Sequence, residues 1–425
     1  MTSSTSPTIT LPLLSNNRIS SLHASTCYFK LPWNFFNKKK FDSTITAMAR
    51  PQRSAMQFNQ VGDSDLTVSE ITFGTMTFGE QNTEKEAHEI LSYAFENGIN
   101  TLDTSEAYPI PMKKETQGLT DIYIGNWLKS QPRHQIILAT KVSGYSERSS
   151  YIRDNAEVVR VDAANIKESN TDISFESYAI LFKPDRYVAL FGEFFYDPSK
   201  WRQSVPFLEQ LRAFEELIQQ GKVRYIGVSN ETSYGVMEFI HAAKSEGLPK
   251  IVSIQNSYSL LVRCKFEGKF SYHAIVYHYK VQDVLLFDLV EVCHPKNGNV
   301  GLLCYSPLAG GSLSGKYLDL ESEAAKKGRL QLFPGYMERY NKSIAKEATA
   351  QYIEMAKKHG LSPVELALGF VRDRPFMTST IIGATSLEQL KEDIDAFLTT
   401  ERPLSPDVMT DIETIFKRYK DPTIL

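Results

Sequence analysis

Short apolar runs and amphipathic stretches alternate along most of this chain, and this alternation restricts its fold more than any other feature. Residues 136–142 and 251–256 are apolar runs typical of buried strands. Residues 83–97 instead repeat their apolar side chains at helical spacing, and Gly98 ends that pattern. Eight such strand–helix repeats predict an α/β fold, a (β/α)8 TIM barrel whose active site lies at the carboxyl ends of its strands.

Residues 56–425 are expected to form this barrel as one domain. The domain begins with a β-hairpin that turns at residues 63–65, and the first barrel strand follows it and ends near Gly74. The eighth strand is expected at residues 380–384, and a C-terminal helix completes the domain. The sequence therefore predicts a barrel with an N-terminal hairpin and a C-terminal helix.

Residues 1–55 differ in composition from the rest of the chain. They are rich in Ser, Thr, Lys and Arg and contain one acidic residue, Asp42. This composition is typical of a transit peptide, and the lack of a compact apolar segment argues against a secretory signal. The Ser and Thr content favours a plastid over a mitochondrion. We therefore predict a disordered targeting segment and a chloroplast stromal protein; a disordered basic tail is the alternative.

The overall composition argues against several classes of partner. With 42% apolar and 23% charged residues, the chain resembles globular proteins that bury a substantial core. Its net charge of −3 gives no electrostatic reason to expect nucleic acid or an acidic membrane as a partner. It contains no apolar run of about 18 residues, so no membrane span is expected. Its Cys and His residues lack metal-site spacing, so no metal is predicted.

Three polar residues follow or end two successive strands of the predicted barrel. Asp103 ends one strand, Tyr108 follows five residues later, and Lys141 lies on the next strand. If the two strands are parallel neighbours, the Lys141 ammonium can reach both other groups. A free phenol has a pKa of about 10, and a nearby ammonium held by a carboxylate favours the phenolate. Tyr108 is therefore expected to donate a proton to a carbonyl oxygen while hydride arrives at the carbon.

Around these residues the chain resembles the aldo-keto reductases. It contains Tyr-Pro-x-Pro at residues 108–111 and Glu-Thr-Gln-Gly-Leu-Thr at residues 115–120, which resemble the Tas-like branch of that family, here of a plant plastid type. The resemblance extends from about Met56 to the C-terminus, with two interruptions. It implies an NADPH-dependent enzyme that reduces an aldehyde or ketone, its small-molecule carbonyl substrate, to an alcohol.

Ser229, Asn230 and Gln255 are expected at the ends of adjacent strands. Their hydroxyl and amide groups suit a nicotinamide carboxamide, which needs both donors and acceptors. The resemblance implies that they bind this group and that the Tyr305 ring stacks on the nicotinamide. A core aromatic is the alternative for Tyr305.

A Gly-rich turn and the last strand supply further cofactor candidates. Ser306, Leu308 and Lys316 belong to a segment that resembles the family's pyrophosphate-contacting loop, in which glycines let backbone N–H groups approach phosphate. The resemblance places four more residues at the adenosine end and its 2′-phosphate, which favours NADPH over NADH: Gly383, Thr385, Gln389 and Glu392. An N-capped surface helix is the alternative for this last stretch.

Two segments, residues 170–183 and 268–287, are atypical of the family. The first replaces the strand that carries the family's catalytic His, and that position falls on Phe182. Residues 178–183 are apolar enough to serve as a substitute fourth strand. We expect Phe182 to impair reduction without abolishing it, because it donates no hydrogen bond. An altered transcript or gene model is our hypothesis for both segments; a divergent isoform is the alternative.

Two other functions remain open from the sequence. The missing His favours an NADP(H)-binding sensor or regulatory module, resembling the potassium-channel β-subunits that share this barrel. An inactive, misfolded product of aberrant splicing is the third possibility. The intact trio of Asp103, Tyr108 and Lys141 favours the enzyme.

Overall fold

The computed structural model describes most of the chain from residue 53 onward. The described residues are 53–146, 149–153, 158–169, 203–268 and 288–424, together with the backbone of residues 177–182. Nearly all of the predicted targeting segment, most of the atypical segment 170–183 and residues 269–287 of the second atypical segment lie outside them.

Eight parallel strands form a closed barrel, as the sequence predicts. In barrel order they are β10 (Met377–Ile382), β3 (Ile71–Gly74), β4 (Thr101–Asp103), β5 (Ile137–Val142), β6 (Ser177–Phe182), β7 (Val223–Ser229), β8 (Ile251–Ser257) and β9 (Gly301–Tyr305). β6 pairs in parallel with both β5 and β7. The atypical segment therefore does supply the fourth barrel strand.

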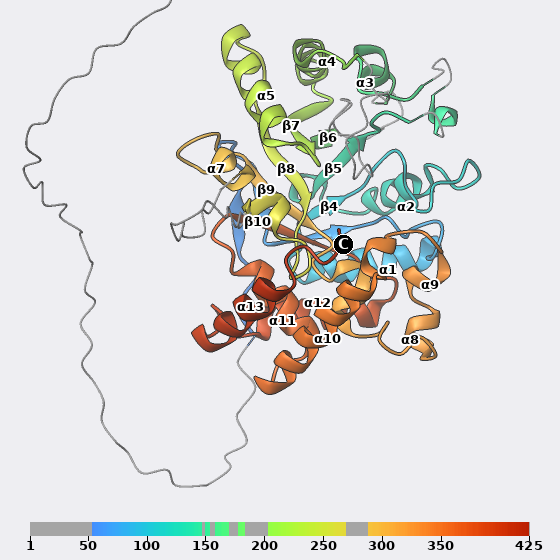
Figure 1. Cartoon of the computed structure of the whole chain (residues 1–425). Coiled ribbons are helices and arrows are strands. Elements are labelled where there is room, and N and C mark those ends of the chain that lie inside the picture. The colour runs from blue at the N-terminus through green and yellow to red at the C-terminus, as the bar shows by residue number, and fades with distance from the viewer. Residues whose placement is uncertain are drawn as a thin grey trace, which may run out of the picture. The chain divides into compact units, whose positions relative to one another are not determined.

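The helices of the barrel lie around the outside of the strands, with α4 and α5 on one side and α10–α13 on the other (Figure 1). The longer helices are α1 (Glu84–Glu96), α2 (Leu119–Leu128), α3 (Ala163–Ser169), α4 (Phe207–Gln219), α5 (Ser233–Glu246), α10 (Ser343–Lys358), α11 (Pro363–Arg372), α12 (Leu387–Thr399) and α13 (Pro406–Arg418). Shorter ones are α6 (Cys264–Glu267), α7 (Leu289–Cys293), α8 (Glu323–Lys326), α9 (Arg329–Leu332), η1 (Arg133–Gln135), η2 (Ser150–Ile152), η5 (Ala309–Ser314) and η6 (Glu338–Tyr340). Among the described residues, no helix is both long and apolar enough to cross a bilayer.

Local sequence explains where α1 begins and ends. The Thr83 side chain accepts a hydrogen bond from the Glu86 backbone, and the Glu86 carboxylate accepts one from Thr83 N at 2.8 Å. This reciprocal pair satisfies two amides that the first turn leaves free. Gly98 follows with φ 88°, a conformation that favours glycine. The apolar side of the helix packs into the core beneath β3 and β4.

β10 differs from the sequence prediction. It spans Met377–Ile382, whereas the expected strand covered residues 380–384. Its early residues Thr378 and Ser379 are polar and were not counted as strand, yet they are buried. The Ser379 hydroxyl donates to Ser69 O at 2.7 Å, and this hydrogen bond compensates the burial of the hydroxyl.

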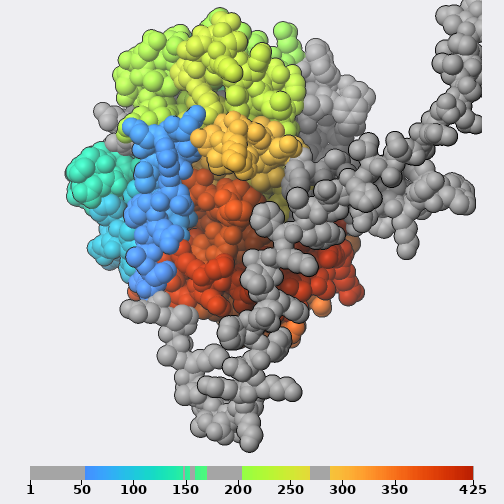
Figure 2. All heavy atoms as spheres, turned by 90° about the vertical axis from the view of Figure 1, so that its left-hand side faces the viewer, coloured from blue at the N-terminus to red at the C-terminus, as the bar shows by residue number. Residues whose placement is uncertain are grey.

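An N-terminal hairpin covers the end of the barrel at which the strands begin. Its strands are β1 (Phe58–Gln60) and β2 (Thr67–Ser69), paired antiparallel. Val68 and neighbouring side chains of the hairpin cluster with Ile137 and Val252, near the starts of β5 and β8. In Figure 2 the first described residues, in blue, form a band over one face of the barrel beside the red C-terminal part. The opposite end of the barrel is left for a functional site.

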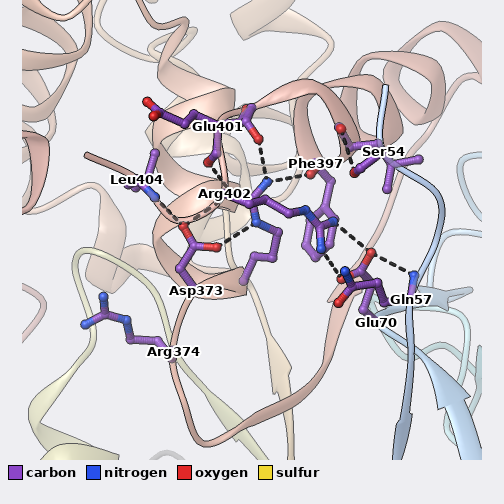
Figure 3. Close-up of polar contacts among 12 residues, drawn as sticks. Ser54, Gln57, Glu70, Asp373, Arg374, Phe397, Glu401, Arg402 and Leu404 are labelled. Carbon is purple, nitrogen blue, oxygen red and sulfur yellow. Dashed lines mark hydrogen bonds and ion pairs between the residues drawn. The ribbon is translucent and has the colours of Figure 1, made fainter. Parts of the chain in front are cut away.

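A polar network joins the start of β3 to the segment before α13 (Figure 3). Arg402 donates two hydrogen bonds to the Glu70 carboxylate, at 2.9 and 2.8 Å, and Glu70 also accepts one from Gln57 N. Arg372 pairs with Asp373, whose carboxylate accepts a further bond from Leu404 N at 2.8 Å. Planar two-bond pairs of this kind fix orientation as well as charge. The network therefore holds the first and last parts of the barrel together.

Candidate active site

Asp103, Tyr108 and Lys141 lie together at the carboxyl ends of β4 and β5. Asp103 is the last residue of β4 and pairs in register with Ala139, two residues before Lys141. The Lys141 ammonium donates to Asp103 Oδ2 at 2.6 Å and to Tyr108 Oη at 3.1 Å. It also donates to Thr104 O at 2.8 Å. One lysine thus joins the carboxylate to the phenol, as the parallel neighbouring strands require.

The Tyr108 phenol holds its proton more firmly than the sequence suggested. Burial raises the pKa of Tyr108 well above its usual range, and the Asp103 charge raises it further. The expectation that Lys141 would favour the phenolate is therefore wrong for the ground state. Lys141 is already paired with Asp103, so the pair brings little net charge to offset the desolvation of a phenolate. Tyr108 is consequently protonated at neutral pH.

Asp121 on α2 lies just behind this group, and sequence reasoning missed it. Its Oδ1 accepts a hydrogen bond from Thr104 Oγ1 at 2.6 Å, and the Thr104 carbonyl in turn accepts from Lys141. Burial raises the pKa of Asp121 to about 6, although the Thr104 hydrogen bond opposes that rise. A second carboxyl group therefore contacts the residue that holds Lys141.

The predicted carboxamide-binding residues lie at the ends of β7 and β8. Ser229 and Gln255 pair in register, and Gln255 Nε2 donates to Asp103 Oδ1 at 2.7 Å. Asn230 has φ 59°, and its Oδ1 accepts from Tyr305 Oη at 2.7 Å. The Tyr305 side chain lines the cavity described below, so it isn't the core aromatic of the alternative interpretation. These amide groups adjoin the catalytic candidates directly.

The Gly-rich turn after β9 lies against Lys316. Gly310 and Gly311 have φ 67° and 94°, which favour glycine. A Cβ at Gly311 would lie 2.9 Å from the Lys316 ammonium and 2.7 Å from Lys316 Cε, so another residue here would displace the end of the Lys316 side chain. Burial lowers the pKa of Lys316, and the charge of Arg329 lowers it further. Two neighbouring cations and a turn without side chains form a place for an anion.

The last strand and α12 form the far end of the site. Gln389 Oε1 accepts hydrogen bonds from the backbone and the hydroxyl of Thr385, both at 3.0 Å. Ser386 caps the helix through Gln389 N, so the stretch is indeed an N-capped helix, but it also faces the cavity. Next to Glu392, burial raises the pKa of Asp393 to about 8. Sequence reasoning did not include Asp393.

A cavity of about 1310 Å³ connects these parts. Every site residue predicted from the sequence lines it: Asp103, Tyr108, Lys141, Ser229, Asn230, Gln255, Tyr305, Ser306, Leu308, Lys316, Gly383, Thr385, Gln389 and Glu392. The cavity is also lined by residues that were missed, in particular Arg329, Tyr336, Arg339 and Asp393. Of these four, only Arg329 had a signal in the sequence: basic residues cluster after the Gly-rich turn.

Phe182 ends β6, where its backbone pairs in register with Val142 and Val228. It therefore occupies the carboxyl end of the strand between those that carry Lys141 and Ser229. For metals, no group of three or more His, Cys, Asp or Glu side chains in the described part of the chain could hold an ion. The described cysteines, Cys264, Cys293 and Cys304, are buried and reduced.

The residues fit a nicotinamide dinucleotide. Amide side chains adjoin an aromatic ring at one end, two cations face a glycine turn in the middle, and polar helix-start residues lie at the far end. These are the donors that a carboxamide, a pyrophosphate and an adenosine need, in that order.

Comparisons with known proteins agree with this geometry. The sequence pattern of the Aldo/keto reductase family matches residues 70–417. Protein tas of Escherichia coli (strain K12) is 40% identical over 378 residues, which cover 86% of this chain and 99% of that protein. A protein of Babesia bovis named "Aldo-keto reductase" is 33% identical over 302 residues, covering 68% of this chain and 98% of the relative. At 24% identity over 372 residues, the chain is also similar to the "Putative voltage-gated potassium channel subunit beta" of Schizosaccharomyces pombe, covering 86% and 94%.

Proposed function

Because this chain belongs to the aldo/keto reductase family, we propose that it is an NADPH-dependent reductase that converts an aldehyde or ketone into an alcohol. One observation carries the proposal: the Lys141 ammonium contacts both the Asp103 carboxylate at 2.6 Å and the Tyr108 hydroxyl at 3.1 Å. This arrangement supports proton donation by a phenol at the carboxyl end of a barrel, where barrel enzymes place their chemistry.

The chain's own residues handle the proton of this reaction. NADPH, when bound, supplies a hydride to the carbonyl carbon. Tyr108 gives its proton to the carbonyl oxygen, and its raised pKa keeps that proton in place until the oxygen gains charge. The phenolate that results lies 3.1 Å from the Lys141 ammonium, which stabilises it. Hydride and proton together convert C=O into CH–OH, and solvent returns a proton to Tyr108.

Named parts of the cavity would hold the cofactor. Ser229, Asn230 and Gln255 would bind the carboxamide, and the Tyr305 ring would stack on the nicotinamide. Backbone groups of residues 306–311 would meet the pyrophosphate near the Lys316 and Arg329 charges. At the far end, residues such as Thr385 and Gln389 would meet the adenosine and its 2′-phosphate, as the family resemblance implies.

Phe182 lowers the rate in this proposal. It takes the place that resemblance assigns to the family's catalytic His, and its side chain has no hydrogen-bond donor for the carbonyl oxygen. Loss of one such donor lowers kcat by about 100- to 1000-fold in other enzymes. The protein is therefore proposed to be a slow reductase.

The proposal is tested by NADPH binding, followed through quenching of intrinsic fluorescence, and by 4-nitrobenzaldehyde reduction in the same sample. Quenching together with NADPH consumption and formation of the alcohol would support it. Quenching without turnover over hours would contradict the enzymatic part.

A second candidate is a nucleotide-binding sensor whose turnover is secondary. Phe182 favours it, because a phenylalanine offers no hydrogen-bond donor, whereas the candidate cofactor-binding residues are all present. The similarity to a fungal protein named as a potassium-channel β-subunit is in keeping with it. Tight NADPH binding with no reduction of any aldehyde would favour this candidate.

We also propose that residues 1–55 direct the protein to the plastid stroma. Their Ser, Thr and basic content supports this proposal. A fusion of residues 1–55 to a fluorescent protein should be imported by isolated chloroplasts and shortened on import. A fusion that stays outside, at full length, would instead indicate a basic tail.

A further inference from the structure

Arg339 carries a charge that nothing in the described part of the chain neutralises. It lies on η6 and lines the cavity. Its Nη2 donates to Tyr340 Oη at 3.1 Å, and its guanidinium carbon lies 4.7 Å from the centre of the Tyr340 ring. Its Nε is buried and has no hydrogen-bond partner among the described residues. Arg339 is therefore a partly desolvated cation whose close partner is neutral.

Among the described residues, three more deeply buried arginines do have carboxylate partners. Arg153, Arg263 and Arg372 have side chains that are at most 3% exposed, and each forms an ion pair with a carboxylate. Arg372, for example, pairs with Asp373 at 2.8 Å. A buried arginine without such a partner is unfavourable, because desolvation of the charge is not compensated. The missing carboxylate beside Arg339 thus indicates that a ligand supplies it.

Arg374 and Arg329 are half-buried and also form no ion pair with a carboxylate in the described chain, and their positions differ. Arg374 lies outside the cavity, with its guanidinium 4.6 Å from the centre of the Phe370 ring. Arg329 lies in the cavity, where its charge lowers the pKa of both Lys316 and Tyr108 and its Nη1 donates to Met76 Sδ at 3.3 Å. Arg339 differs from both, because it lies in the cavity and its buried Nε has no hydrogen-bond partner among the described residues.

Arg339 lies in the cavity near the tyrosines around the proton donor, as Arg329 also does. Its charge acts on Tyr305 and Tyr336, lowering the pKa of each against the effect of burial. Tyr336 in turn lies near enough to Tyr108 for the two phenols to influence each other. The same cavity contains all four side chains. An anion on Arg339 would therefore sit at the end of the cavity where the carbonyl is reduced.

We propose that Arg339 binds a carboxylate of the carbonyl substrate, so that the protein acts on aldehydes or ketones that are also carboxylic acids. A guanidinium presents two parallel N–H groups that match the two oxygens of a carboxylate. The carboxylate is unchanged in the reaction: hydride and proton go to the carbonyl alone. The proposal rests on the proposed reductase function, from which it takes the identity of the reacting group.

The test compares 4-carboxybenzaldehyde and benzaldehyde, which differ only in the carboxylate group, with the full chain. For the wild type we expect kcat/KM to be at least about 10-fold higher for the carboxylate. Arg339→Met should lower that value by about 10- to 100-fold, mainly through KM, and change the benzaldehyde value by less than about threefold. Arg339→Lys should keep part of the preference, because it retains the charge.

Arg374→Met is the matched control, since Arg374 also has a buried Nε without a partner but lies outside the cavity. This variant should leave kcat/KM for both aldehydes within about threefold of the wild-type values. An equal loss for both aldehydes in Arg339→Met would overturn the proposal. So would weaker NADPH binding with unchanged aldehyde preference, because Arg339 would then bind the cofactor.

Calorimetric titration of 4-carboxybenzaldehyde separates this proposal from the proposed reductase function. If no aldehyde is reduced, the reductase function fails, yet wild-type protein with NADPH present should still bind the carboxylate compound more tightly than Arg339→Met does. If NADPH itself does not bind, the same titration is made on the protein alone. Equal binding by wild type and variant would contradict the role of Arg339 in either case.

Discussion

The Lys141 ammonium lies 2.6 Å from Asp103 Oδ2, and the side chains of both residues are at most 7% exposed. Register between β4 and β5 brings them together, since Asp103 pairs with Ala139 and Lys141 follows two residues later. A buried pair of this kind is stable only as a pair, because either charge alone would lose its solvation without compensation.

Removal of one partner should therefore cost more than removal of both. Asp103→Asn should lower the free energy of unfolding by about 3–5 kcal/mol, because it leaves the Lys141 ammonium without a counter-charge. The double variant Asp103→Asn, Lys141→Met should be less destabilised than Asp103→Asn alone. Urea unfolding of the wild type, of the single variants Asp103→Asn and Lys141→Met and of the double variant measures this coupling. Additive losses would show that the two charges do not depend on each other.

Phe182→His should restore a hydrogen-bond donor at the end of β6. We expect kcat/KM for 4-nitrobenzaldehyde to rise by about 100-fold, with the NADPH dissociation constant unchanged within about twofold. Phe182→Leu is the control, because it changes the side chain without adding a donor. A similar rise in both variants would point to steric relief and would refute the hydrogen-bond explanation.

Gly311→Ala should weaken NADPH binding. The new Cβ would lie 2.9 Å from the Lys316 ammonium, and the residue would keep a φ of 94° that side chains rarely adopt. Gly360→Ala meets nothing within 4 Å at a φ of 70°, so it carries the backbone strain without the clash. We expect a loss of at least about tenfold in NADPH affinity for Gly311→Ala alone. Equal affinities would mean that Lys316 does not bind the cofactor through this turn.

The stability of the protein should depend on pH through Asp393. Burial raises its pKa to about 8 in the folded state, beside Glu392 and Lys316, whereas the usual value is 3.8. Between these values the folded state binds the extra proton, so rising pH removes stability, by an amount on the order of several kcal/mol at most.

Asp393→Asn removes this dependence. The difference in unfolding free energy between the variant and the wild type should grow in favour of the variant from pH 5 to pH 8. Urea unfolding at both pH values measures it. A difference that stays constant over this range would show that Asp393 is ionised in the folded protein.

Local patterns predicted most of the barrel. The extent of α1 followed from apolar spacing and the terminating Gly98, and strand ends placed Asp103 and Lys141 in one site. β10 was placed about three residues too late, because Thr378 and Ser379 are buried although polar. Periodicity reports which side chains are apolar, and polar strand residues that find partners escape it.

The site residues and pKa shifts that the sequence did not reveal depend on how the folded chain encloses the cavity. Arg329 and Arg339 lie in short helical turns after the Gly-rich loop, and their positions over the cavity result from packing rather than from strand order. Burial in the closed cavity desolvates Tyr108 and raises its pKa. This effect cannot be predicted from the charged residues near Tyr108 in the sequence. Burial of Asp393 was missed for the same reason.

The central claim, that Tyr108 donates the proton to a carbonyl group, is tested most directly by Tyr108→Phe. NADPH oxidation at saturating 4-nitrobenzaldehyde is compared for wild type and variant, with NADPH affinity measured on the same samples. The account predicts a fall in kcat of at least about 100-fold, with NADPH affinity unchanged within about twofold, because only the donor is removed. A variant that reduces the aldehyde at the wild-type rate would contradict it.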